Sequence, residues 1–372
     1  MQFIVKRDIL LKSLNFVQGV VEKKNTLPIL SNVLLQLKDK KLSIVATDLD
    51  IVFYDEISEV KILKEGSTTT SAAILYDILR KISSDSELNF DLKTENKLSL
   101  KSDNSDFNLL CLPTDNFPTF ADEFEGSEIY LDNKRFLKLL NKTKIAISND
   151  DTRHYLNGIF LHLTEAHGRN FLTGVATDSH RLSSSSLEIE NVNDFSSLIL
   201  PRKAVFQLCS LLTESTEKLS MMTSENKIKF TIGNISLVSK VIDGKFPDYK
   251  KVVPANNEKS LVLPSKDFIN SIERVASVSL DRKEGVKLSI NKENIQLSVN
   301  SANSGEGNEI IKANFNSNDL LNISFNSQYL IDIASEIEDK NLKMNLKDSV
   351  SPVLIEDASD KNSYYVIMPM KI

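Results

Sequence analysis

The residues with the most suggestive chemistry are Asp178, Ser179 and His180, because an acid, a hydroxyl and an imidazole are the three groups of a hydrolase triad. Consecutive residues, however, cannot converge on one another in the geometry that this chemistry needs. The chain also lacks a Gly-x-Ser-x-Gly segment, the turn that exposes the nucleophile in one large hydrolase class. A hydrolase that uses His180 is therefore kept only as an alternative hypothesis.

Other side chains that bind cofactors or metals do not occur in the required spacing. There is no Gly-x-x-x-x-Gly-Lys phosphate loop, no Gly-x-Gly-x-x-Gly segment and no His-Glu-x-x-His pair. His154, His162 and His167 are not spaced as metal ligands. Cys111 and Cys209 sit in apolar runs, which is typical of core residues in a reducing compartment. The sequence therefore predicts no cofactor and no metal.

The composition is that of a folded protein with more than one domain. The chain has 372 residues, of which 41% are apolar and 26% are charged, and one hydrophobic core seldom supports so many. Charges at Lys6, Arg7 and Asp8 interrupt the apolar run that a secretory signal would need, and no later run reaches the length of a membrane span. We therefore expect a cytoplasmic protein. The net charge of -6 argues mildly against a protein that binds nucleic acid through an overall positive charge.

The elements that position these residues repeat three times along the chain. Each copy begins with a short strand-like run followed by a helical period, and a second helical period comes later in the copy. The first period places an apolar pair four residues apart on one helix face. These pairs are Leu10 and Leu14, Phe136 and Leu140, and Phe268 and Ile272.

Between the helical periods lie alternating apolar and polar runs, the pattern of half-buried strands. Ala-Thr-Asp follows such a run at 46–48 and again at 176–178, and the copies close on Phe117-Pro118, Phe246-Pro247 and Met368-Pro369. An antiparallel sheet covered by two helices buries the apolar faces of both. We therefore predict an α+β protein of three tandem domains of one fold, at residues 1–125, 126–252 and 253–372.

Positive charge gathers on helices although the chain as a whole is acidic. The helical segment at 133–144 contains five basic residues and no acidic one, and three of them, Arg135, Lys138 and Lys142, share the face opposite Phe136 and Leu140. A solvated helix face is the ordinary explanation of such a pattern. Because basic pairs recur at the ends of other helical segments, contact with a phosphate backbone, without base readout, is the alternative hypothesis.

Several longer strings resemble one family along the whole chain. They are TLPIL at 26–30, RHYLNG at 153–158, VATDSHRL at 175–182, LPRKAV at 200–205, DGKFPDY at 243–249, DSVSPVLIEDA at 348–358 and YVIMPMKI at the end. The chain resembles the bacterial DNA sliding clamp, the β subunit of DNA polymerase III. The resemblance implies a processivity factor without catalytic activity. It also implies that two copies assemble head to tail into a ring of six clamp domains, with helices lining the hole. Such a ring encircles duplex DNA and tethers the polymerase catalytic subunit, the clamp loader and repair proteins.

The resemblance also implies three sets of site residues. A pocket for the short linear peptides of partners would be lined by Leu156, Thr177, His180, Arg181, Leu182, Pro247, Val252, Asn326, Tyr329, Val350, Val366, Met368, Pro369, Met370 and Ile372. Contact with DNA would come from Lys24, Arg80, Arg153, His154 and Tyr155, to which the basic pattern adds Arg135, Lys138, Lys142, Arg202 and Lys203. The dimer seam would use Phe107 and Leu109 on one side and Ser277 and Val278 on the other.

The sequence departs from the family pattern at some of these places. Ser179 stands where glycine is common, His154 where tyrosine is frequent, Ala73 where a basic residue is frequent, and Pro352 where a small polar residue is usual. Ser277 is smaller and more polar than the apolar residue usual at the seam. A monomeric scaffold that binds peptides without encircling DNA is the second alternative, and ring formation separates it from the clamp.

Overall fold

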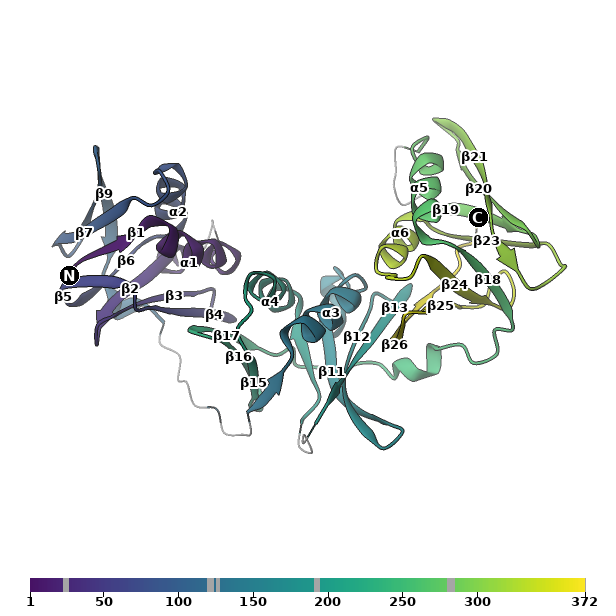
Figure 1. Ribbon diagram of the computed structural model, residues 1–372, viewed down its shortest axis with the longest axis horizontal. Coiled ribbons are helices and arrows are strands. Elements are labelled where there is room, and N and C mark those ends of the chain that lie inside the picture. Colours follow the sequence, from purple (N-terminus) through teal and green to yellow (C-terminus); the bar gives the residue numbers. More distant parts are fainter. Residues whose placement is uncertain (23–26, 119–123, 125–127, 191–194, 280–284, 372) are drawn as a thin grey trace. The chain divides into compact units, whose positions relative to one another are not determined.

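The computed structural model describes residues 1–22, 27–118, 124, 128–190, 195–279 and 285–371 (Figure 1). The chain forms two compact units. One combines Met1–Lys134 with Lys203–Val241, and the other combines Arg135–Arg202 with Ile242–Ile372. No helix in the described ranges is both long and apolar enough to cross a membrane.

The first unit is built on one antiparallel sheet of thirteen strands. The strands are β1 (Gln2–Lys6), β2 (Asn32–Lys38), β3 (Lys41–Thr47), β4 (Ile51–Ile57), β5 (Val60–Lys64), β6 (Gly66–Ser71), β7 (Glu87–Thr94), β8 (Lys97–Ser102), β9 (Ser105–Leu112), β10 (Ile129–Leu131), β15 (Leu219–Thr223), β16 (Lys227–Ile232) and β17 (Ile235–Lys240). Their order in the sheet is β10-β15-β16-β17-β4-β3-β2-β6-β9-β8-β7-β1-β5. Helices α1 (Arg7–Val20), α2 (Ala72–Lys81) and α4 (Arg202–Glu214) accompany it, with short 3-10 turns η1 (Pro28–Ser31) and η2 (Thr114–Asn116).

The second unit contains a nine-stranded and a four-stranded antiparallel sheet. The first has the order β14-β11-β12-β13-β26-β25-β24-β18-β22 and the second β21-β20-β19-β23. The strands are β11 (Gly158–Ala166), β12 (Arg169–Thr177), β13 (Arg181–Ile189), β14 (Leu198–Pro201), β18 (Lys259–Pro264), β19 (Gly285–Ile290), β20 (Asn294–Ser301), β21 (Gly305–Lys312), β22 (Asn314–Phe315), β23 (Leu321–Asn326), β24 (Asn341–Leu346), β25 (Val353–Asp357) and β26 (Asp360–Ile367). The helices are α3 (Asn133–Lys144), α5 (Ser265–Ala276) and α6 (Ser327–Ser335), with 3-10 turns η3 (Asp151–Leu156) and η4 (Tyr249–Val252).

The helices form where the apolar spacing predicts them. Leu10 and Leu14 are buried on α1, Phe136 and Leu140 on α3, and Phe268 and Ile272 on α5. Two helices therefore belong to each expected copy, α1 with α2, α3 with α4, and α5 with α6. The predicted α+β fold with antiparallel sheets is confirmed.

Close packing of helix on sheet explains two glycines inside strands. A Cβ on Gly174 of β12 would lie 2.6 Å from Cδ2 of Leu139 on α3, and one on Gly307 of β21 would lie 2.8 Å from the carbonyl oxygen of Val275 on α5. Both distances are too short for a real contact. Glycine therefore allows each helix to approach its sheet.

Successive copies are joined in the same way at two places, because a strand of one copy pairs with a strand of the next. In the first unit β4 pairs with β17, with Val52 opposite Val238. In the second unit β13 pairs with β26, with Leu182 opposite Val366. The two junctions also share a sequence feature. The copy that ends at the first junction closes on Phe117-Pro118, and the copy that ends at the second closes on Phe246-Pro247.

Candidate functional site

A small apolar pocket lies in the second unit, where β13 and β26 join. It encloses about 240 Å³. Its walls come from η3, the turn between β12 and β13, the segment around η4, and the end of β26. The lining residues are Leu156, Thr177, Ser179, His180, Arg181, Leu182, Pro247, Asp248, Tyr249, Val252, Val366 and Met368.

The pocket combines a rigid floor with exposed apolar edges. Leu182 and Val366 face one another across the two strands and are buried. Val252 and Met368 are 49% and 40% exposed. Methionine repacks at low cost, so such an edge accepts apolar side chains of different shapes. The arrangement is that of a binding pocket for short apolar segments.

Arg181 is held rigidly beside this pocket. Its Nε lies 3.1 Å from a carboxylate oxygen of Asp178, and its Nη1 lies 2.6 Å from one of Asp332. The guanidinium also lies 4.2 Å from the ring centroid of Tyr329, within the range of a cation–π interaction. Two carboxylates and a ring thus fix the orientation of the guanidinium.

The residues that look like a hydrolase triad form a turn. One carboxylate oxygen of Asp178 accepts hydrogen bonds from the backbone N–H groups of His180, at 2.9 Å, and Arg181, at 3.0 Å. The hydroxyl of Ser179 accepts a hydrogen bond from Arg153. The φ angle of Ser179 is 78°, in the left-handed region where glycine is favoured, which explains the preference for glycine that the family resemblance implies here. Asp178 and Ser179 are therefore used in building the turn, and not in activating each other.

Tyr249 forms one side of the pocket and is positioned by His162. The Nε2 of His162 lies 3.1 Å from the Tyr249 hydroxyl, and Nδ1 lies 3.0 Å from the carbonyl oxygen of Leu163. Phe160 stacks on His162 and on Phe246, with ring centroids 4.7 Å and 4.9 Å apart. Burial lowers the pKa of His162 and raises the pKa of Tyr249 to about 12. The neutral imidazole therefore donates from Nδ1 and accepts from the tyrosine at Nε2.

Some of the expected pocket residues lie outside this cavity. Asn326 accepts a hydrogen bond from the Tyr329 N–H and so caps α6. Tyr329 is not among the lining residues, and its ring contacts Arg181, which is one of them. Val350 is largely exposed, and the backbone N–H of Met370 donates to Ser324 at 2.7 Å. Pro369 is not among the lining residues, and Ile372 lies outside the described residues.

Three lining residues were missed from the expected set. Ser179, Asp248 and Tyr249 line the cavity although only their neighbours were expected to do so. Asp248 and Tyr249 close the string DGKFPDY, and Ser179 lies inside VATDSHRL. The signal for them was therefore present in the same two strings that pointed to Pro247 and His180.

The basic residues expected to contact DNA differ in their availability. Arg80 and Arg135 are exposed on α2 and α3. Lys203 is half-buried and pairs with Asp48 at 2.5 Å, while Arg202 bonds the side chain of Asn149. Lys24 lies outside the described residues.

A second group of expected DNA contacts surrounds η3. Arg153 pairs with Asp150 at 2.9 Å. The Nε2 of His154 lies 3.2 Å from the carbonyl oxygen of Asp243, and the ring of His154 meets that of Tyr155 edge-on at 5.9 Å. These side chains are partly or largely exposed.

The expectation that Lys142 contacts DNA is wrong. Its side chain is 2% exposed, and its Nζ lies 2.9 Å from Asp360, 3.4 Å from Asp357 and 3.6 Å from Glu338. A lysine surrounded by these carboxylates cannot reach a phosphate without breaking several ion pairs. Lys138, one turn earlier, is partly exposed but also pairs with Glu338 and Asp360.

Two strands expose a backbone edge. Residues 105–110 of β9 pair only with β8 among the described strands, and β21 is the last strand of its sheet. Both edges carry exposed apolar side chains, since Leu110 is 84% and Ile310 65% exposed. Open edges with apolar side chains favour pairing with another chain.

The expected seam residues lie near these edges. Phe107 lines a cavity of about 710 Å³ together with Ile74 and Ile78 of α2, whereas Leu109 is buried within its own unit. Ser277 is exposed just after α5, and Val278 packs against the core of the third copy. The hydrogen bond from Arg274 to Glu309, at 2.9 Å, holds α5 to β21.

In the described part of the chain, no group of three or more histidine, cysteine, aspartate and glutamate residues could hold a metal ion. The clusters described above are ion pairs and hydrogen-bonded turns.

Comparison with known proteins identifies relatives along the whole chain. Residues 1–121, 130–248 and 250–371 match the family models of the N-terminal, central and C-terminal domains of the DNA polymerase III beta subunit. Proteins named "Beta sliding clamp" from Caulobacter vibrioides and Escherichia coli K12 are 35% and 34% identical, with all of both chains covered.

Solved structures give the same result. A DnaN sliding clamp from Bartonella birtlesii, bound to griselimycin, is 38% identical with a TM-score of 0.95. The DNA polymerase III subunit beta from Pseudomonas aeruginosa is 32% identical with a TM-score of 0.91. Both comparisons cover the whole of each chain.

Proposed function

This chain belongs to the DNA polymerase III beta subunit family of sliding clamps, and from that premise we propose which of its residues perform each part of the function. Three domain matches, together with identity of about one third over the full length, carry the assignment. The chain is a DNA sliding clamp. Two copies form a head-to-tail ring that encircles duplex DNA and tethers the replicative polymerase and other replication and repair proteins.

Encirclement explains why an acidic chain can act on DNA. A closed ring holds the duplex by topology, so its contacts with phosphates can stay few and weak, and the ring slides as the polymerase advances. The net charge of -6 is then no obstacle. We assign the phosphate contacts to Arg80, Arg135 and Arg153, because these side chains are partly or fully exposed.

Partner peptides bind, in our proposal, in the pocket between β13 and β26. A pocket of about 240 Å³ accepts one or two apolar side chains, and the exposed side chains of Val252 and Met368 can repack around them. Arg181, fixed by Asp178 and Asp332, supplies a positioned cation for a polar group of the peptide. The remaining expected residues at 326, 329, 350, 369, 370 and 372 would extend the same surface.

The ring closes, in our proposal, by pairing of the open edge of β9 in one protomer with that of β21 in the other. A head-to-tail contact that closes after two copies gives a ring and not a filament. The cavity beside Phe107, which Ile74 and Ile78 line together with polar residues of β8 and β9, would receive residues 277–278 of the partner, which follow α5. We propose domain boundaries at 125 and 252, close to the limits of the family matches.

We further propose that the clamp has no catalytic activity of its own and works in the bacterial cytoplasm. Asp178 and Ser179 have structural partners in the turn, which supports the first proposal. The hydrolase alternative predicts a turnover that disappears in His180→Ala. Detection of such a turnover would refute a purely mechanical role.

Retention on DNA of two topologies tests the function. The protein is loaded by a clamp loader onto closed circular DNA, half of which is then linearised, and both samples are washed at salt high enough to screen phosphate contacts. We expect retention on circles and loss from linear ends. Equal loss from both would indicate ordinary charge-driven binding and favour the monomeric scaffold.

A further inference from the structure

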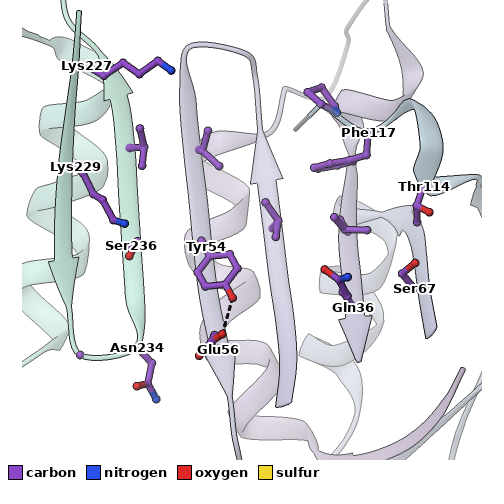
Figure 2. Close-up of a pocket in the computed structure, with 16 residues that line it drawn as sticks. Gln36, Tyr54, Glu56, Ser67, Thr114, Phe117, Lys227, Lys229, Asn234 and Ser236 are labelled. Atoms are coloured by element: carbon purple, nitrogen blue, oxygen red, sulfur yellow. Dashed lines mark hydrogen bonds between the residues drawn. The ribbon is translucent and has the colours of Figure 1, made fainter. Parts of the chain in front are cut away.

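A larger groove in the first unit has no role in the function described above. It encloses about 790 Å³, within the range of sites that bind small molecules and peptides. Its floor is the sheet face formed by β17, β4, β3 and β2, with β16 on one side and β6 and η2 on the other (Figure 2).

The floor of this groove is apolar where a solvated sheet face is usually polar. Leu34 lies opposite Val45 across β2 and β3, and Val52 lies opposite Val238 across β4 and β17. All four side chains line the groove. Strand residues alternate between faces, so on β4 the buried Phe53 points into the core while Val52 faces the groove. The two pairs are offset by two residues, because Val45 lies opposite Tyr54 and Val52 opposite Thr47. Together they form a diagonal apolar row across four strands, and an apolar area rimmed by polar residues is typical of an interaction site.

The groove is the internal counterpart of the peptide pocket. Val52, Val238 and Pro118 line the groove, and they occupy the same strand register and the same Phe-Pro position as Leu182, Val366 and Pro247, which line the pocket. The repeated fold thus builds an apolar depression at both of its strand junctions. The depression at the first junction encloses about 790 Å³, roughly three times the 240 Å³ at the second.

The charges around the groove select the occupant. Lys227 and Lys229 both stand on β16 and extend toward β17 in Figure 2. No described residue forms an ion pair with Lys227, whereas the Nζ of Lys229 lies 5.9 Å from the ring centroid of Phe124 and its charge also acts on the carboxylate of Glu128. The one acidic lining residue, Glu56, is already satisfied, because it accepts a hydrogen bond from Tyr54 at 2.6 Å and pairs with Lys41 at 2.5 Å. The described lining residues therefore carry two positive charges and one negative charge.

We propose that this groove is a second docking site for linear peptides, and that it takes an extended segment in which carboxylates alternate with aliphatic side chains. The aliphatic side chains would lie on the row of Val52 and Val238, and the carboxylates would pair with Lys227 and Lys229. A clamp with this site holds two different peptides on one protomer. The proposal goes beyond the function given above and does not depend on the pocket at the second junction.

Fluorescence anisotropy with a labelled octapeptide of alternating leucine and aspartate tests the proposal, with a leucine–lysine octapeptide as the charge control. We expect the acidic peptide to bind and the basic one not to bind. The variant Lys227→Glu/Lys229→Glu should weaken binding by about tenfold or more. The matched variant Lys218→Glu/Lys266→Glu changes the total charge equally at exposed lysines outside the groove and should bind as the wild type does.

A second variant separates loss of the site from loss of the fold. Ser236→Trp fills the groove from β17 without changing charge, and it should abolish binding while retention on circular DNA stays normal. Removal of residues 368–372 should leave binding of the acidic octapeptide unchanged. Absent binding to the wild type, or equal binding to Lys227→Glu/Lys229→Glu, would overturn the proposal. Displacement of the octapeptide by a short duplex oligonucleotide would also overturn it, because the lysines would then be a phosphate site.

Discussion

The Nζ of Lys142 on α3 lies 2.9 Å from a carboxylate oxygen of Asp360 on β26, in a cluster almost closed to solvent. This pair joins residues 218 positions apart, and Asp357 lies 3.4 Å from the same nitrogen. The ion pairs connect a helix of the central copy to strands of the third copy. Because Val366 of the peptide pocket is also on β26, the cluster supports the strand that the pocket is built on.

Lys142→Met should destabilise the protein strongly. The substitution leaves Asp357 buried without its cation and leaves Asp360 with only the partly exposed Lys138, and loss of one partner of a buried pair costs about 3–5 kcal/mol. Urea unfolding at neutral pH measures the change. Lys134→Met, at an exposed position of the same helix, is the control and should change the free energy of unfolding by less than about 0.5 kcal/mol. Equal effects of the two substitutions would show that the cluster contributes little.

Acid should weaken this cluster in a defined pH range. Burial alone would raise the pKa of Asp360, but hydrogen bonds and charge from Lys142 and Lys138 outweigh it and lower the pKa to about 2. A carboxyl whose pKa is lowered on folding stabilises the protein above its unfolded pKa, near 3.8, and that stability is lost as the pH falls toward 2. The free energy of unfolding should therefore decline between these values more steeply in the wild type than in Asp360→Asn. Parallel curves would contradict the role assigned to Asp360.

The sequence predicts the helices well because their apolar periodicity is local. The segment at 133–144 was expected to be a helix and is one. The same local reasoning failed for Lys142, which a helical wheel assigns to a basic face. Its partners Asp357 and Asp360 lie far away in the chain, and no local pattern reveals them. The buried lysine is a tertiary feature.

In the candidate sites, too, the local sequence predicts some features, and others depend on contacts between distant parts of the chain. The string VATDSHRL pointed to His180 and showed Ser179 where glycine is common, while the reason for a glycine preference there, a φ of 78°, requires the structure. The groove at Val52 was missed because β4 reads IVFYDEI, which does not alternate cleanly between apolar and polar residues. Its apolar row appears only when four strands are set side by side. The contacts proposed for DNA and for partner peptides remain predictions.

Removal of Met368 to Ile372 should abolish binding of a polymerase tail peptide and leave the ring intact. Met368 lines the pocket, and its backbone N–H donates to the carbonyl oxygen of His180 at 2.8 Å, which ties the segment to the opposite wall. Anisotropy with the labelled tail peptide measures binding, and sedimentation measures the ring. Lys371→Ala, which changes only an exposed charge, is the control. A truncated protein that still bound the tail peptide would refute the pocket assignment.

Peptide affinity should hold at about pH 6.5, the ordinary pKa of histidine, and fall at lower pH. Burial and the nearby Lys250 lower the pKa of His162, so in the folded protein the imidazole stays neutral until the pH falls to that lowered pKa. Protonated Nε2 can no longer accept the hydrogen bond from Tyr249, a lining residue of the pocket. His162→Phe keeps the stack on Phe160 and should flatten the pH profile.

The exposed His180 also lines the pocket, so its contribution to peptide binding must be separated from that of His162. In His180→Gln the fall in affinity should persist, because the hydrogen bond between His162 and Tyr249 is unchanged. If the pH dependence vanished in His180→Gln and survived in His162→Phe, then direct contact with His180, and not the position of Tyr249, would govern affinity.

Ser277→Leu should strengthen the ring. Ser277 is exposed after α5, at a position proposed to enter the cavity beside Phe107 of the partner, where Ile74 and Ile78 offer apolar contact. Burying a leucine there stabilises the contact by about 1.5–3 kcal/mol, and about 1.4 kcal/mol corresponds to a tenfold lower Kd. The ring has two such seams, so the substitution acts twice. The dimer Kd from sedimentation at low concentration should fall at least about tenfold, with a longer lifetime on circular DNA. Ser58→Leu adds the same side chain at an exposed turn away from the seam and should leave the Kd unchanged. A ring unaffected by Ser277→Leu would mean that the edges of β9 and β21 meet without residue 277 entering the cavity, and the apolar contribution to closure would then have to come from Leu110 and Ile310.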